Sequence, residues 1–225
     1  GKTSKFKSAF NIMNIENLKQ IEMDALIYDV DLIKKSSPDS LTIGETETQQ
    51  DIDVIKKLLK FPLLSEESDW KIRFQREFNK TDDRNIFNTI KVGSPLYEGE
   101  MIHQFNHKFK EPTFWIDSKK GIDILTNRQK NRITSKLKKF SKKGQELKYP
   151  EIKIDYDHYR LTWRDVTSET NTRTILCTIL PPKVFSVYTL PYLRPNYFNG
   201  LNFEKAISSE TMMFLCGLFN SFVID

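Results

Sequence analysis

The chain has 225 residues, of which 38% are hydrophobic and 29% are charged, and its formal net charge is +5. This composition is typical of a globular protein that buries a core, and the absence of a long apolar run excludes a membrane-spanning chain. Both cysteines, Cys177 and Cys216, lie in apolar runs, which favours buried free thiols in a reducing cytoplasm over a disulfide.

The N-terminal part of the chain is expected to contain helices and a few strands. Residues 14–23 begin with Asn14, a favourable helix N-cap, and residues 48–59 place apolar side chains on one helical face. Between these segments, residues 25–33 alternate like a strand. We therefore expect residues 1–88 to form a connector region.

From Pro95 the pattern changes to short strand-like runs separated by turns. These runs lie at residues 96–109, 113–117, 159–166, 174–180 and 184–189. A long helix is expected over residues 125–139 and a buried helix over 210–223, which has no stop signal before the chain ends. We expect residues 89–225 to be a domain truncated at its C-terminal end. The whole pattern predicts an α+β fold, with mixed sheets and packed helices.

Positive charge is concentrated in one segment of the chain. Residues 103–148 contain 13 Lys and Arg against 4 Asp and Glu, a local net charge of +9 that exceeds the total of the whole chain. Such a surplus attracts polyanions, of which nucleic acid is the commonest in the cell. Asn, Gln, Ser and Thr are interleaved with the densest part, residues 126–144, and these types contact bases and phosphates. The alternative is a solvated lysine-rich face or loop.

Four blocks of sequence resemble one family of DNA-modifying enzymes. They are residues 95–105 (PLYEGEMIHQF), 159–174 (YRLTWRDVTSETNTRT), 180–182 (LPP) and 218–222 (LFNSF). In this order they are similar to the target-recognition region of adenine-N6 DNA methyltransferases of the type IIG restriction–modification, Taq-type and BREX phage-defence group. The resemblance spans about residues 70–225, and the first 60 residues look like the connector that follows the catalytic domain in this family.

The resemblance implies that catalysis and DNA recognition belong to different parts of a longer parent protein. In this family a Rossmann-like domain binds S-adenosylmethionine and methylates a flipped adenine, and the C-terminal region recognises the DNA sequence. The run from Leu180 to Lys183 has two prolines but lacks the polar and aromatic residues of the catalytic loop. We therefore expect no catalytic residue and no cofactor in this fragment, with S-adenosylmethionine bound by the missing catalytic domain.

The same resemblance implies the partners and the location of the protein. We expect it to bind double-stranded DNA and the catalytic methyltransferase domain of its own parent chain, and not a membrane. The location implied is the cytoplasm of a prokaryotic cell, in association with the nucleoid.

The DNA contacts are expected in the basic segment, because it falls between the family blocks, where proteins with different targets would differ. The candidates are Arg128, Lys130, Arg132, Lys136, Lys138, Lys139, Lys142 and Lys143. The five lysines from Lys136 onward would neutralise phosphates and set the register. The first three residues would reach base edges in a groove of the duplex.

A second group of residues belongs to the family motifs and is interpreted mainly as structural. These residues are Tyr97, Gly99, Arg164, Asn171, Arg173 and Thr174. Residues shared by proteins that recognise different sequences are poor candidates for setting each sequence. The alternative for Asn171 and Arg173 is direct contact with DNA.

Other functions predict different sites. His103 and His107 would lie about 13 Å apart on a strand, too far for easy chelation, so no metal site is expected there. A divalent-metal nuclease would use Glu151 and Lys153, with Asp39 as a distant partner. A protein-interaction module of a multi-subunit phage-defence complex would dock its partners through the acidic N-terminal part.

Overall fold

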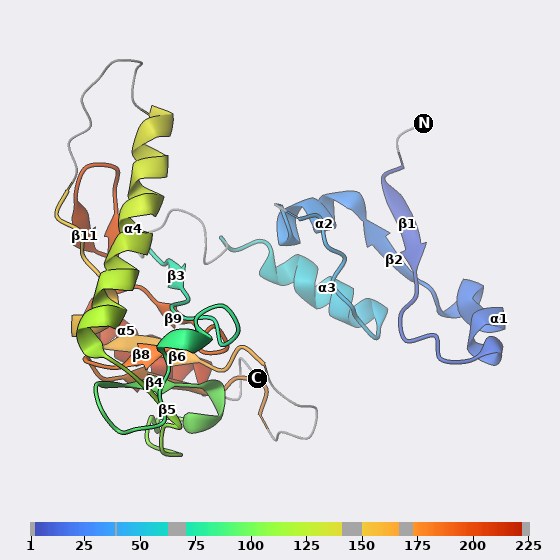
Figure 1. Cartoon of the computed structure of the whole chain (residues 1–225). Helices are drawn as coiled ribbons and strands as arrows, with labels where there is room; N and C mark the ends of the chain where they lie inside the picture. The colour runs from blue at the N-terminus through green and yellow to red at the C-terminus, as the bar shows by residue number, and fades with distance from the viewer. Residues whose placement is uncertain (1–2, 39, 63–70, 141–149, 167–172, 222–225) are drawn as a thin grey trace. The chain divides into compact units, whose positions relative to one another are not determined.

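The chain divides into two compact units, residues 1–66 and residues 67–225 (Figure 1). The computed structural model describes residues 3–38, 40–62, 71–140, 150–166 and 173–221. The expected boundary lay later, at residue 88, whereas the second unit of the structure already includes residues 71–88. The reason is that β3 (Phe74–Gln75) pairs with β9 (Tyr192–Leu193), which belongs to the same sheet as the later strands.

In its described residues, the first unit combines one two-stranded sheet with three helices. β1 (Lys5–Ser8) pairs antiparallel with β2 (Leu26–Asp29). The helices are α1 (Ile15–Asp24), α2 (Val30–Ser36) and α3 (Gln49–Leu58). Asn14 and Thr48 cap the N-termini of α1 and α3, each accepting a hydrogen bond from a backbone N–H of the first turn. The cap at Asn14 is the one that the sequence predicts.

The strand expected over residues 25–33 is only half correct, because the chain becomes helical at Val30. Leu32 and Ile33 are adjacent and both buried with Tyr28 and Ile52 in the core of this unit. A strand would point neighbouring side chains to opposite faces, so burying both favours a helical turn.

The described residues of the second unit form two sheets, a separate hairpin and two α-helices. The four-stranded sheet has the order β3–β9–β6–β7, with β6 (Arg160–Trp163) and β7 (Cys177–Leu180) antiparallel. The three-stranded sheet has the order β5–β4–β8, with strands β4 (Ser94–Tyr97), β5 (Phe114–Ile116) and β8 (Phe185–Ser186). β10 (Asn196–Phe198) and β11 (Phe203–Lys205) form the hairpin. The helices are α4 (Ser118–Phe140) and α5 (Ser209–Phe219). The predicted α+β class is therefore confirmed.

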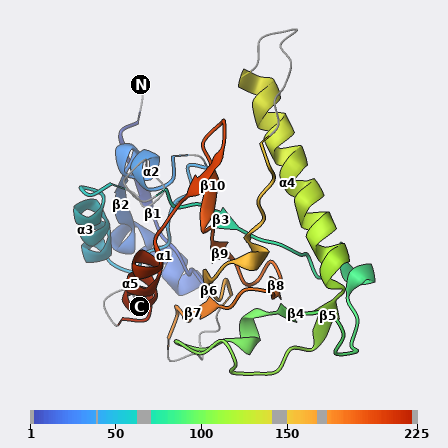
Figure 2. The ribbon, with the colours of Figure 1, turned by 90° about the vertical axis from the view of Figure 1, so that its left-hand side faces the viewer.

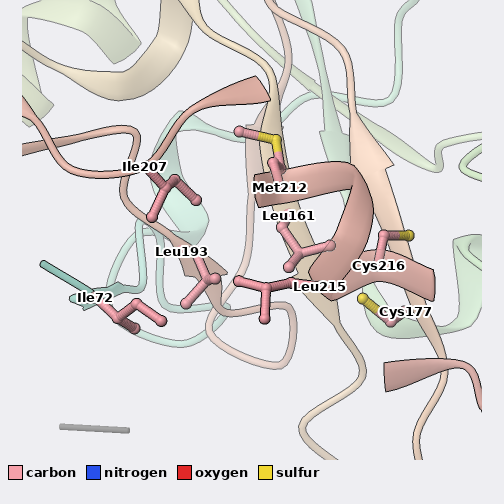
Figure 3. Packing of buried hydrophobic residues seen from close by; sticks show 8 residues of the cluster. All are labelled: Ile72, Leu161, Cys177, Leu193, Ile207, Met212, Leu215 and Cys216. Atoms are coloured by element: carbon pink, nitrogen blue, oxygen red, sulfur yellow. The ribbon is translucent and has the colours of Figure 1, made fainter. Parts of the chain in front are cut away.

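The four-stranded sheet packs against α5 through an apolar core (Figure 3). Its buried members are Ile72, Leu161, Cys177, Leu193, Ile207, Met212, Leu215 and Cys216. The two cysteines come from a strand and from the helix packed on it, and both are buried free thiols, as predicted. Ser208 caps the start of α5 by accepting a hydrogen bond from the Thr211 N–H.

The base of α4 packs against the three-stranded sheet. Gly121 lies so close to Phe185 that a Cβ built there would be 2.5 Å from the ring. Leu125 is buried with Ile116 and Phe185 in the same cluster. The helix therefore begins at Ser118, earlier than the residue 125 expected, because its first turns are stabilised by packing rather than by helix propensity.

In the described part of the chain, no helix is both long enough and apolar enough to cross a membrane. The longest helix, α4, has eight Lys and Arg residues and one Asp in its sequence. Its second half carries most of the candidate DNA contacts.

Candidate nucleic-acid interface

The exposed cations of α4 do not form a single face. Lys130, Arg132, Lys136 and Lys138 are all exposed. Because successive residues of an α-helix are about 100° apart, Arg132 and Lys136 lie on one side, and Lys130 and Lys138 lie on the opposite side. The exposed cations of the predicted basic segment thus form two pairs on opposite sides of α4. A ligand bound to one side of the helix contacts one pair and not the other.

Arg128 points into the domain. Its guanidinium donates to the Asp83 carboxylate (Nη2–Oδ1, 2.5 Å) and to the Glu77 carbonyl (Nη1–O, 3.0 Å). It also lies over the Phe78 ring, 5.5 Å from the centroid. These contacts hold α4 against the preceding loop, so the guanidinium already has partners within the fold.

Arg132 and Lys136 line a groove of about 700 Å³ between α4, β3 and β10. Figure 2 shows α4 and the hairpin extending from the same side of the unit. The lining consists of Lys71, Arg73, Phe74, Gln75, Arg132, Ser135, Lys136, Arg194, Tyr197, Phe198 and Asn199. Five of these described residues are Lys or Arg and none is Asp or Glu, and we call this feature the basic groove.

Three cations of the basic groove were missed by the sequence prediction, namely Lys71, Arg73 and Arg194. They lie outside the segment of high local charge, and the fold brings them to it. The sequence contained a signal for two of them, because Lys71 and Arg73 flank the apolar Ile72. Ile72 is buried, so in an extended chain the two cations project from the opposite face.

The cations of the groove differ in how they are held. Arg132 donates to the Gln75 side chain (Nη1–Oε1, 2.7 Å), and Arg73 donates to the Ile72 carbonyl at 2.8 Å. Arg194 donates to the Asp155 carboxylate (Nε–Oδ2, 2.8 Å), which offsets part of its charge. Lys71 and Lys136 form no ion pair with another described residue.

A buried polar network holds Arg194, one of the residues that line the groove. Arg160 is fully buried and pairs with Glu77 (Nη1–Oε1, 2.9 Å). The Tyr192 hydroxyl lies 3.1 Å from Glu77 Oε1 and 3.2 Å from Asp155 Oδ2, and Asp155 in turn binds Arg194. Burial raises the pKa of the Tyr192 hydroxyl well above its usual value, and the two carboxylates add to the effect. The network therefore fixes the position of Arg194 relative to β6 and β9.

Three of the predicted motif residues lie together and act structurally. Arg164 donates to the carbonyls of Gly99 (Nε–O, 2.7 Å) and Ile102 (Nη2–O, 2.8 Å). This contact joins the end of β6 to the 3-10 turn η2 (Gly99–Met101), where the strand expected over residues 96–109 ends early. Tyr97, just before this turn, is buried.

Of the remaining motif residues, Arg173 contacts the end of α5 and Thr174 lies at the surface. Arg173 donates to the Asn220 carbonyl at 2.7 Å, and the Asn220 side-chain amide donates to the Cys177 carbonyl at 2.9 Å. Thr174 is exposed. Asn171 lies outside the described residues. Lys142 and Lys143 also lie outside them, as does the side chain of Lys139.

The alternative metal sites gain no support from the geometry. His103 lies in a tight turn, with its N–H donating to the Asn106 carbonyl at 2.8 Å. Within the described ranges, no three His, Cys, Asp or Glu side chains gather as a metal site requires. Glu151 and Lys153 are exposed, and Asp39 lies outside the described ranges.

No protein-family model and no curated protein matches this chain.

Proposed function

We propose that this chain is the sequence-specific DNA-recognition part of a larger adenine-N6 DNA methyltransferase and is itself non-catalytic. The observation that carries the DNA-binding part of the proposal is the basic groove, whose described lining residues include five cations and three aromatic side chains but no carboxylate. Such a combination suits a sugar–phosphate backbone with bases beside it. The assignment to a methyltransferase rests on the four sequence blocks.

In this account, Arg132 and Lys136 bind phosphates on one side of α4, together with Lys71 and Arg73. Each phosphate neutralised releases condensed counterions, so binding weakens as salt rises. If about six phosphates are bound, the slope of log affinity against log salt is about −5. Lys130 and Lys138, on the opposite side of the helix, contribute less because one backbone strand cannot reach both sides.

The experiment that tests the full proposal is performed in the parent organism. N6-methyladenine is mapped across the genome with and without the gene, and then with residues 128–143 exchanged for another sequence. We expect one motif to lose its methylation when the gene is deleted, and the motif to change or lose methylation after the exchange. Methylation that is unchanged when the gene is deleted would contradict the proposal.

A second candidate function is favoured by the first unit. The helix α1 exposes apolar side chains, with Ile15 at 69%, Leu18 at 55% and Met23 at 83% of their full area. Exposed apolar residues gathered on one element are characteristic of protein–protein contacts. A protein-interaction module therefore predicts a stable partner whose association is lost in Leu18→Glu and retained in Lys19→Glu.

A further inference from the structure

The β10–β11 hairpin forms the second wall of the basic groove. Tyr197, Phe198 and Asn199 of the hairpin line it, and Arg132 and Lys136 of α4 line it as well. Because both walls border the same volume, a ligand strand that occupies the groove lies between the helix and the hairpin.

The tip of the hairpin is a well-defined turn. The Asn199 side chain accepts hydrogen bonds from the backbone N–H groups of Leu201 and Asn202, each at 2.8 Å. Gly200 has a φ of 106°, a conformation that favours glycine. These constraints leave the Leu201 side chain 79% exposed at the end of the hairpin, where it stabilises no core.

The dimensions of the hairpin match a groove of duplex DNA. A two-stranded ribbon fits the major groove, which is about 12 Å wide and about 8.5 Å deep. The three residues of β10 extend about 10 Å, so the tip can reach the base edges while the base of the hairpin stays at the backbone. An apolar side chain at the tip suits the thymine methyl group, and asparagine suits adenine.

The charge on the hairpin is compatible with this position. Its carboxylate, Glu204, accepts hydrogen bonds from the Tyr197 hydroxyl at 2.6 Å and from the Asn199 amide at 2.5 Å. Lys205 is the next residue of β11, and the groove residues Lys71, Arg73 and Lys136 add further positive charge. The net charge around the hairpin is therefore positive, as a phosphate backbone requires.

We propose that one strand of duplex DNA occupies the basic groove and that the tip of the β10–β11 hairpin enters the major groove beside that strand. The inference rests on the proposed DNA-recognition function and adds the hairpin to α4 as a second element that contacts DNA. Leu201 contacts thymine methyl groups, Asn202 contacts base edges, and Lys71, Arg73, Arg132 and Lys136 hold the phosphates.

The first test places a DNA-cleaving reagent at the tip. An iron–EDTA group is attached to Leu201→Cys in the full chain, where the two native cysteines are buried and react poorly. The control carries the same group on Lys108→Cys, an exposed position outside the groove lining. We expect several-fold more nicking of plasmid DNA from the tip than from the control. Equal nicking from the tip and from the control, while the unlabelled chain still binds DNA, would overturn this inference but not the proposed function.

The second test removes the thymine methyl group. Affinity is measured for a mixed-sequence duplex and for the same duplex with deoxyuridine in place of thymidine. The wild-type chain should lose about four-fold in affinity on the deoxyuridine duplex, whereas Leu201→Ala should show no difference between the two. A wild-type chain that binds both duplexes equally would contradict the role of Leu201. A wild-type chain that binds neither would refute the proposed function itself, and this inference with it.

Discussion

Arg128 and Asp83 form an ion pair across 45 residues of sequence, with 2.5 Å between Nη2 and Oδ1. The pair joins the middle of α4 to the loop before the 3-10 turn η1 (Arg84–Ile86), and the same guanidinium binds the Glu77 carbonyl. An arginine that the sequence suggests as a base contact thus has two hydrogen-bond partners inside the domain. Its charge stabilises the position of the helix that carries Arg132 and Lys136.

The role of Arg128 predicts a loss of stability. Arg128→Gln removes a charge-assisted hydrogen bond and leaves the carbonyl of Glu77 without its donor, so the free energy of unfolding should fall by about 2 kcal/mol. Lys130→Gln removes the same charge two residues away at an exposed position and should change it by less than about 0.5 kcal/mol. Urea denaturation measures the unfolding free energy of both variants. Equal stability of the two would show that the Arg128 contacts contribute nothing.

The buried pair of Arg160 and Glu77 predicts non-additive mutations. Arg160→Met leaves the Glu77 carboxylate buried without its cation, at a cost of about 3–5 kcal/mol in unfolding free energy. The double variant Glu77→Gln/Arg160→Met removes the uncompensated charge and should therefore be more stable than Arg160→Met alone. Denaturation of the single and double variants tests this, and a double variant that is less stable than Arg160→Met would contradict it.

The buried Tyr192 hydroxyl predicts sensitivity to alkali. Its pKa is raised in the folded protein, so its contribution to stability is complete below pH 10 and is lost as the pH rises above that value. The wild-type chain should therefore lose up to about 1.4 kcal/mol per pH unit more than Tyr192→Phe above pH 10. Unfolding free energies at several pH values give both slopes. Parallel slopes would show that Tyr192 ionises as easily in the folded state as in the unfolded state.

Two helical glycines predict opposite effects of the same substitution. Gly217 lies in α5 with no atom within 4 Å of an added Cβ, so Gly217→Ala should stabilise the protein by up to about 1 kcal/mol. Gly121→Ala would place its Cβ 2.5 Å from the buried Phe185 ring, so α4 or the ring must shift and stability should fall despite the better helix propensity. Thermal unfolding of both variants tests the close approach of α4 to β8. Stabilisation by both substitutions would mean that α4 has room to move.

The sequence predicts most of the elements but not the arrangement that forms the groove. The caps at Asn14 and Thr48 are local signals, and the predicted helices that they start are present. The start of α4 at Ser118 depends on tertiary packing of Gly121 against Phe185, which a propensity pattern does not contain. Local rules therefore predict an element well when its stabilising contacts are themselves local.

The candidate site shows the same limit. A local charge count identifies the segment that contains Arg132 and Lys136, but it treats Lys130 and Lys138 as equivalent to them. Helical geometry places the two pairs on opposite sides of α4. The cations that share the groove with Arg132 and Lys136 come from the region of β3 and from the connection between β9 and β10, which are distant in sequence. Sheet pairing between β3 and β9 is what brings these distant cations together.

The measurement that tests the account most directly compares two double variants of α4 in duplex DNA binding. Arg132→Gln/Lys136→Gln removes two cations from the basic groove, and Lys130→Gln/Lys138→Gln removes two cations from the opposite side of the same helix. Affinity is measured for the full chain across a range of salt concentrations. The groove variant should flatten the slope of log affinity against log salt by about 2, and the control variant should leave it close to the wild-type value. Equal losses from both variants, or a wild-type slope near zero, would contradict the proposal that the basic groove binds DNA.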